Sequence, residues 1–369
     1  MFSDNDRISI RQVKVLLILD LFGVSSLTLP KLAANYGKED AWLVVILSTL
    51  LAIIYAVVVT KLACSFPNQT FTQYTEKITN RFFAVVISVF LLIKFILASA
   101  LELRVFGELI KQTMLRKTPI EIIMISMLLT AAYLARKGYE SRGRLGEMVI
   151  VIALIPILMI FLFATKEVNI RNLMPMFVSK PSDVMKGIYN LSLNFGGVEL
   201  MLLATAYLNK PKKAMNATIK SIIIVGILNL IITVITIGTY GVGSTTKYIW
   251  PVLSMMSIVE IPILFIERQD ALMMSFWIIT VFSLITAYIF FASLLLRQIF
   301  KLKEQNYLVL PLLPFIYIIA LIPDNIVQTY DYIKKMTFYL GPISLIILPL
   351  ILLSIAKIRK LGGGNGEKN

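Results

Sequence analysis

Long apolar runs alternate with short polar stretches along most of the chain. Ten runs are each about as long as the roughly 20 residues that a helix needs to cross a bilayer. They are Ser9–Ala34, Ala41–Ser65, Phe82–Ile110, Pro119–Ala135, Leu145–Thr165, Val184–Leu208, Thr218–Val242, Ala271–Phe300, Tyr307–Ile322 and Phe338–Ile358. Because these runs lack the period-2 alternation of membrane strands, the pattern predicts about ten transmembrane helices.

The composition agrees with a membrane protein. Of the 369 residues, 58% are hydrophobic and 15% are charged, whereas soluble domains have roughly 45–50% and about 25%. We therefore expect an all-α integral membrane protein in which residues 1–369 form a single transmembrane domain.

Several classes of chemistry are absent from the sequence. It has no histidine, and Cys64 is its one cysteine, so a histidine-dependent triad, a cysteine cluster and an internal disulfide are excluded. It also lacks a P-loop, an HExxH motif and a dinucleotide fingerprint. We expect neither an enzyme nor a bound cofactor or metal.

The distribution of positive charge predicts the orientation. The net charge is +15, and more lysines and arginines, with Arg136, Lys137, Arg142 and Arg144 among them, fall at the termini and after the even-numbered spans. Because cytoplasmic loops are enriched in these residues, both termini are expected in the cytoplasm. The net positive charge is then explained by the orientation of the chain in a lipid membrane, and we expect no binding of nucleic acid.

Three polar or mixed segments lie outside the spans. Asn68–Asn80 suits either a short interfacial helix or a solvated loop. Trp250–Asp270 is apolar but interrupted by prolines and charges, which favours a re-entrant or surface helix. The tail Gly362–Asn369 is expected to be a flexible end.

Spans one and six carry interruptions. The first holds Gly23, Val24, Ser25 and Ser26 before Pro30, and the second holds Asn194, Phe195, Gly196, Gly197 and Glu199. Glycine leaves helical geometry easily, and proline lacks a donor. Each span opens a group of five, so the sequence predicts two inverted repeats, residues 1–166 and 167–360, followed by the tail 361–369.

Matched interruptions in two inverted halves mark the binding site of many transporters. The N-terminus of a half-helix attracts a carboxylate, and the C-terminus of another presents carbonyls to an ammonium group. The alternative is that the glycines only permit close helix packing. We favour a ligand site between spans one and six.

Ionisable side chains inside the spans are costly and usually face a cavity or a partner. Glu199 is expected to be a ligand or proton-linked group, or else an anchor for the unwound backbone. Asp20 is expected either to line a cytoplasmic vestibule or to pair with a cation on another helix. Lys94 falls near the middle of the membrane. Glu102, on a different face from Arg104, joins the expected ligand set.

Two further groups of polar residues belong to spans three and eight. Arg104 and Glu108 have i,i+4 spacing, which predicts an ion pair that is either a plain outer-rim contact or part of a gate. Thr280, Ser283 and Thr286 form one stripe. Ser283 and Thr286 are candidate ligand residues, although such hydroxyls often bond to their own helix.

The motifs resemble those of the endospore germination permease family within the amino acid–polyamine–organocation superfamily. They are GVSSLTLP at Gly23–Pro30, RVFGE at Arg104–Glu108 followed by Thr118 and Pro119, FGGVE at Phe195–Glu199, and WP at Trp250 and Pro251 leading to IPILFIERQD at Ile261–Asp270. Members are the B subunits of spore germinant receptors.

The resemblance implies an amino acid transporter-like fold in the spore inner membrane. It also implies a nutrient ligand (an amino acid, sugar or nucleoside) and two partners, an A subunit and a lipoprotein C subunit. Our leading hypothesis is a germinant-sensing subunit that triggers germination after binding a solute. The alternative is an ion-coupled amino acid uptake permease, since a fold does not fix a function.

Overall fold

The computed structural model describes residues 6–23, 25–258 and 269–361, which are almost entirely helical. Within these ranges the β-structure is confined to an isolated bridge between Ile8 and Leu208. Every predicted span contains helix. The bounds are α1 (Ile10–Phe22), α2 (Ser25–Gly37), α3 (Ala41–Cys64), α4 (Phe71–Ile78), α5 (Arg81–Thr113), α6 (Ile120–Arg136), α7 (Tyr139–Ala164), α8 (Pro181–Ser192), η4 (Leu193–Leu200), α9 (Met201–Ala204), α10 (Ala214–Thr245), α11 (Pro251–Met256), α12 (Gln269–Ile299), α13 (Val309–Leu321), α14 (Ile326–Pro342), η8 (Ile343–Ile347) and α15 (Leu348–Ile358).

Five helical stretches among the described residues are long and apolar enough to cross a membrane by length and composition. They are Ser26–Cys64, Arg81–Thr113, Pro211–Thr245, Met274–Ile299 and Ile326–Ile358. Spans one and six divide into shorter helices, so neither forms one long apolar helix. The chain is thus an integral membrane protein of the expected all-α class, whereas the two inverted repeats stay a prediction.

Two helices begin earlier than the apolar runs indicated. α14 begins at Ile326 rather than Phe338, and Asn325 caps it by accepting a hydrogen bond from the Gln328 N–H at 3.0 Å. Its first turns carry polar side chains that line a cavity, so an apolar run does not reveal them. α7 begins at Tyr139 rather than Leu145.

The segment after span two contains a helix, which settles the choice left open there. α4 begins with a capping box formed by Thr70 and Gln73, and it buries Phe71, Tyr74 and Ile78. After span seven, α11 is a short helix. Residues 259–268, which hold most of the IPILFIERQD motif, and the tail 362–369 lie outside the described residues.

The interruption of span one separates α1 from α2. α1 ends at Phe22, and Gly23 leaves helical geometry with φ −11° and ψ −160°. α2 then begins at Ser25 and contains Pro30, which has no N–H for the carbonyl one turn before it. Val24 lies outside the described residues.

Span six differs from a simple unwound break. α8 runs into η4, a stretch of tighter 3₁₀ winding in which Phe195 leaves helical geometry with ψ 21°. Winding of this kind in the middle of a helix often marks a functional hinge. The predicted interruption is therefore present, but the chain stays coiled through it.

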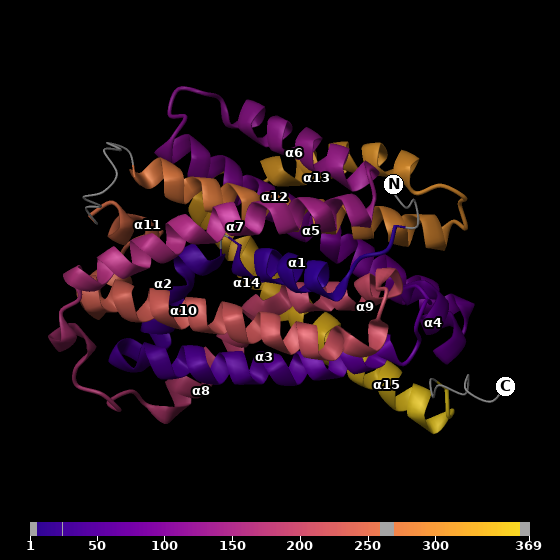
Figure 1. Cartoon of the computed structure of the whole chain (residues 1–369), viewed down its shortest axis with the longest axis horizontal. Helices are drawn as coiled ribbons and strands as arrows, with labels where there is room; N and C mark the ends of the chain where they lie inside the picture. The colour runs from indigo at the N-terminus through magenta and orange to yellow at the C-terminus, as the bar shows by residue number, and fades with distance from the viewer. Residues whose placement is uncertain (1–5, 24, 259–268, 362–369) are drawn as a thin grey trace.

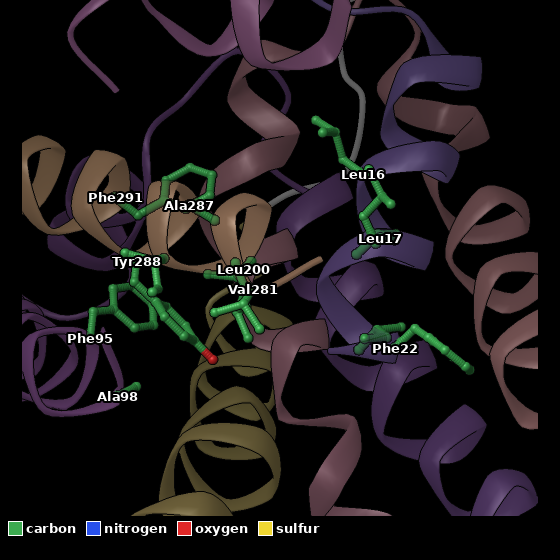
Figure 2. Packing of buried hydrophobic residues seen from close by; sticks show 14 of the residues in the cluster. Leu16, Leu17, Phe22, Phe95, Ala98, Leu200, Val281, Ala287, Tyr288 and Phe291 are labelled. Carbon is green, nitrogen blue, oxygen red and sulfur yellow. The ribbon is translucent and has the colours of Figure 1, made fainter. Parts of the chain in front are cut away.

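The two interrupted spans pack at the centre of the molecule. α1 contacts α7, α10, α12 and η4, while α12 also packs against α5 and α6. Figure 2 shows the apolar packing around them, with Leu17 and Phe22 of α1 on one side and Phe95 and Tyr288 beside each other on the other. The rings of Phe95 and Tyr288 stack with centroids 5.6 Å apart.

The start of α1, the end of α15 and α4 lie toward the same end of the helix bundle (Figure 1). There the N-terminal segment is tied to the end of span six, because the Ile8 N–H donates to the Tyr207 carbonyl at 2.8 Å and the Asn209 N–H donates to Ile8 at 3.1 Å. We call this the terminus end, and the other the far end.

Candidate binding site

Two adjoining cavities lie where the interrupted spans meet α5 and α14. The outer one, here the vestibule, has a volume of about 570 Å³ and is lined by residues of α2, α5, α8 and α14. The inner one, here the central cavity, has about 90 Å³ and reaches Gly196, Gly197 and Glu199. Glu102, Asn194, Ile333 and Thr337 line both.

Glu102 and Asn194 carry unsatisfied polar atoms at this junction. Glu102 Oε2 and Asn194 Nδ2 are buried without a hydrogen-bond partner among the described residues. Buried polar atoms are normally paired, and leaving one unpaired costs about 1–3 kcal/mol. An acceptor and a donor in one cavity wall are thus available to a ligand.

Glu199 is neutralised from α5. It forms a buried ion pair with Lys94, whose Nζ also donates to Ser344 Oγ in η8. The exposed side-chain fractions of Lys94 and Glu199 are 7% and 2%. Glu199 is therefore held by a lysine side chain of α5 rather than by the unwound backbone, and because Lys94 and Glu199 both line the central cavity, its ligand role stays a prediction.

Asp20 forms a second buried ion pair, with Arg142 of α7. Arg142 Nη2 also donates to the carbonyl and the hydroxyl of Ser283, both at 3.1 Å, and the Ser283 hydroxyl lies 2.8 Å from Asp20 Oδ1. Asp20 therefore pairs with a cation on another helix, and it also lines the central cavity. Arg142, which we counted among the charges between spans four and five, lies within α7, and its side chain is 2% exposed.

Arg104 and Glu108 form the ion pair that their spacing predicted. Arg104 Nη2 lies 3.0 Å from Glu108 Oε1 and also donates to the Asp324 carbonyl at 3.0 Å. The second contact joins α5 to the loop before α14 near the far end. The geometry suits a fixed rim contact, and a gating role stays a prediction.

The remaining predicted residues divide between the cavity and internal contacts. An added Cβ at Gly196 would meet no atom within 4 Å, whereas at Gly197 it would lie 3.2 Å from Leu21. Phe195 is buried in the core beside them. Gly23 also has room, with Leu284 at 3.8 Å.

Several predicted hydroxyls bond inside the protein. Ser26 Oγ donates to the Gly23 carbonyl at 2.8 Å and accepts from Trp277 at 3.0 Å. Thr286 donates to the Phe282 carbonyl of its own helix at 2.7 Å, as Thr280 does to Trp277. Ser25 begins α2.

Arg142 and Ser344 are the functional candidates that sequence reasoning missed. A signal existed for Arg142, because an acid as deep as Asp20 needs a cation and Arg142 directly precedes span five. Ser344 lies in the π-helical stretch η8, which has no comparable sequence signal.

Comparison with known proteins identifies the family. A family model described as spore germination protein matches residues 7–329. The chain belongs to this spore germination permease family.

Two relatives match the chain over almost its whole length. It is 30% identical to spore germination protein YndE of Bacillus subtilis (strain 168), over 98% of this chain and 99% of that protein. It is 28% identical to spore germination protein GerLB of Bacillus cereus, over 98% of this chain and 97% of that protein.

A solved structure shares the fold. The crystal structure of MhsT in complex with L-phenylalanine matches with a TM-score of 0.68 at 12% identity, covering 95% of this chain and 98% of MhsT. At that identity the likeness concerns the fold alone. The chain therefore belongs to a permease-like family and has a transporter-like fold.

Proposed function

We propose that this chain is the germinant-sensing membrane subunit of a spore nutrient receptor. It binds a small solute in the central cavity and the adjoining vestibule, and it passes the change to an A-type subunit and a lipoprotein C-type subunit. The site of action is the spore inner membrane, with both termini in the cytoplasm. Family membership and the cavities between interrupted helices support this proposal.

The observation that carries the proposal is the pair of unsatisfied atoms at the junction of the cavities. Glu102 offers a carboxylate oxygen, and Asn194 offers an amide N–H. An α-amino acid matches both, because its ammonium group pairs with Glu102 and its carboxylate accepts from Asn194. The vestibule volume of about 570 Å³ lies within the range of small-molecule sites. MhsT was solved with an amino acid bound.

Binding of labelled amino acids, sugars and nucleosides to the purified chain tests this proposal. Glu102→Gln should weaken amino acid binding at least about 30-fold, because a buried charge pair is lost. Glu108→Gln, on the same helix at the rim, is the matched control and should bind normally. Equal amino acid binding by both variants would contradict the assignment.

An ion-coupled amino acid uptake permease is the second candidate, and the fold shared with MhsT favours it. Uptake of labelled amino acids into proteoliposomes separates the two. Saturable, ion-driven accumulation by this chain alone would favour the permease. Binding without accumulation, with germination that requires the partner subunits, would favour the receptor.

A further inference from the structure

The contacts of Arg142 have the composition of a site for a free alkali cation. Its Nη2 is bound by both carboxylate oxygens of Asp20 and by the carbonyl and hydroxyl oxygens of Ser283. Carboxylate, carbonyl and hydroxyl oxygens are the ligands that hard cations prefer. The contacted groups come from two helices, α1 and α12, and the cation comes from a third, α7.

The position of these oxygens in the fold also resembles that of a site for a free alkali cation. Asp20 lies in the last turn of α1, just before the interruption at Gly23. The C-terminal end of a helix carries partial negative charge, and half-helix ends inside membrane proteins coordinate sodium ions or protons. A cation at this point is stabilised both by the Asp20 carboxylate and by the end of α1.

The resident cation is permanent. A guanidinium group keeps its proton at all physiological pH values, and the Arg142 side chain is 2% exposed. Its Nε and Nη1 have no hydrogen-bond partner in the described part of the chain. Arg142 also lines a lateral, mostly apolar cavity of about 440 Å³ between α6, α7 and α12. Its hydrogen bonds to Asp20 and Ser283 therefore hold the guanidinium group.

We propose that Arg142 is a tethered cation that fills an alkali-cation site between α1, α7 and α12. The protein then holds α1 against α7 and α12 without sodium, and its stability does not depend on that ion. Removing the guanidinium exposes the oxygens of Asp20 and Ser283 to solution and converts the position into a site for a free cation. This inference holds whichever solute the central cavity binds.

Thermal unfolding of the purified full chain in sodium chloride and in choline chloride, at equal ionic strength, tests the proposal. The wild type should unfold at the same temperature in both salts, within about 1 °C. Arg142→Ala should unfold roughly 5–10 °C lower in choline, because it leaves Asp20 buried and unpaired. Sodium, or a few millimolar guanidinium, should restore at least about half of that loss.

Three variants control for general damage. Arg144→Ala, two residues along α7 and partly exposed, should show no difference between the salts. Arg142→Lys keeps a tethered cation and should also be insensitive. Asp20→Asn combined with Arg142→Ala removes the carboxylate and should abolish the sodium response.

Specific stabilisation of the wild type by sodium would overturn the proposal, as would an Arg142→Ala protein that sodium does not stabilise, whether or not guanidinium does. If Arg142→Ala yields no folded protein in choline, purification in sodium throughout decides the question. Recovery in sodium alone supports a vacated cation site. Failure in both salts, with normal recovery of Arg142→Lys, overturns it.

Discussion

Three carboxylates lie deep between the helices and differ in what neutralises them. Asp20 has Arg142, and Glu199 has Lys94. Glu102 has no such cation among the described residues, and its Oε2 is unpaired. Because a buried charge without a partner is costly, the two ion pairs contribute to the packing of the helices, and under our proposal Glu102 is the acid that pairs with the ligand.

The Lys94–Glu199 pair should behave as a unit. Lys94→Met leaves a buried carboxylate and should destabilise the protein by about 3–5 kcal/mol, whereas Lys94→Met with Glu199→Gln should recover most of that loss. Thermal unfolding of the single and double variants measures this coupling. Lys335→Met breaks an exposed pair with Asp331 and should cost no more than about 1 kcal/mol. A double variant as unstable as Lys94→Met would contradict the pairing.

At the scale of elements, the two glycines of η4 have different surroundings. Gly196 faces open space at the central cavity, whereas Gly197 packs against Leu21 and the carbonyl of Asp20 in α1. The first position therefore leaves open space in the central cavity, and the second allows close approach of the two interrupted spans.

Substitutions by valine should separate these roles. Gly196→Val fills the cavity and should reduce solute binding at least tenfold with little change in unfolding temperature. Gly197→Val crowds Leu21 and should destabilise the protein by about 1–3 kcal/mol. Binding and thermal unfolding of both variants provide the comparison, and normal binding by Gly196→Val would exclude the central cavity as the ligand site.

A loop at the far end is attached through Asp40, which follows α2. The backbone N–H groups of Phe177 and Ser179 donate to its carboxylate at 2.5 and 2.9 Å. Burial acts to raise the pKa of Asp40, but the hydrogen bonds from Ser179 and Phe177 outweigh it and hold the pKa below its usual value. The charged carboxylate therefore stabilises this attachment.

The depressed pKa fixes the direction of the pH effect. Stabilisation by Asp40 should be complete above the unfolded pKa of about 3.9 and should disappear as the pH falls through the folded value. Asp40→Asn should cost about 1–3 kcal/mol at pH 7 and progressively less below pH 4. Unfolding temperatures of both proteins across this range test it. A constant difference down to pH 3 would exclude the carboxylate as the cause.

For the molecule as a whole, the sequence predicted the all-α class, helix within every expected span and the position of both interruptions. These depend on local properties, namely apolar length and the occurrence of glycine and proline. The ion pairs join positions 105 and 122 residues apart. Such pairings depend on how helices pack, so the burial of Arg142 and the role of Ser344 did not follow from local pattern.

The arrangement of cavities and contacts also predicts which side admits the solute. At the terminus end, Ile8 is bonded to the end of span six, and the Asp20–Arg142 pair lies buried just before the interruption of span one. The vestibule lies on the other side of the interruption, along α2 and the start of α14, where it reaches Asn35. The described state should therefore be accessible from the far end.

Thiol labelling with a charged, membrane-impermeant reagent tests this access. Cys64 is the one cysteine, so Cys64→Ala provides a background in which Asn35→Cys reports on the vestibule and Glu76→Cys, in α4, reports on the terminus end. In sealed vesicles that expose the far end, Asn35→Cys should react and Glu76→Cys should not. Permeabilising the membrane should allow Glu76→Cys to react. A bound solute should slow the reaction of Asn35→Cys, because it fills the space that the reagent must cross.

Reaction of Glu76→Cys alone in sealed vesicles would reverse the assigned orientation. Equal reaction at Asn35→Cys with and without a saturating solute would separate the vestibule from the binding path.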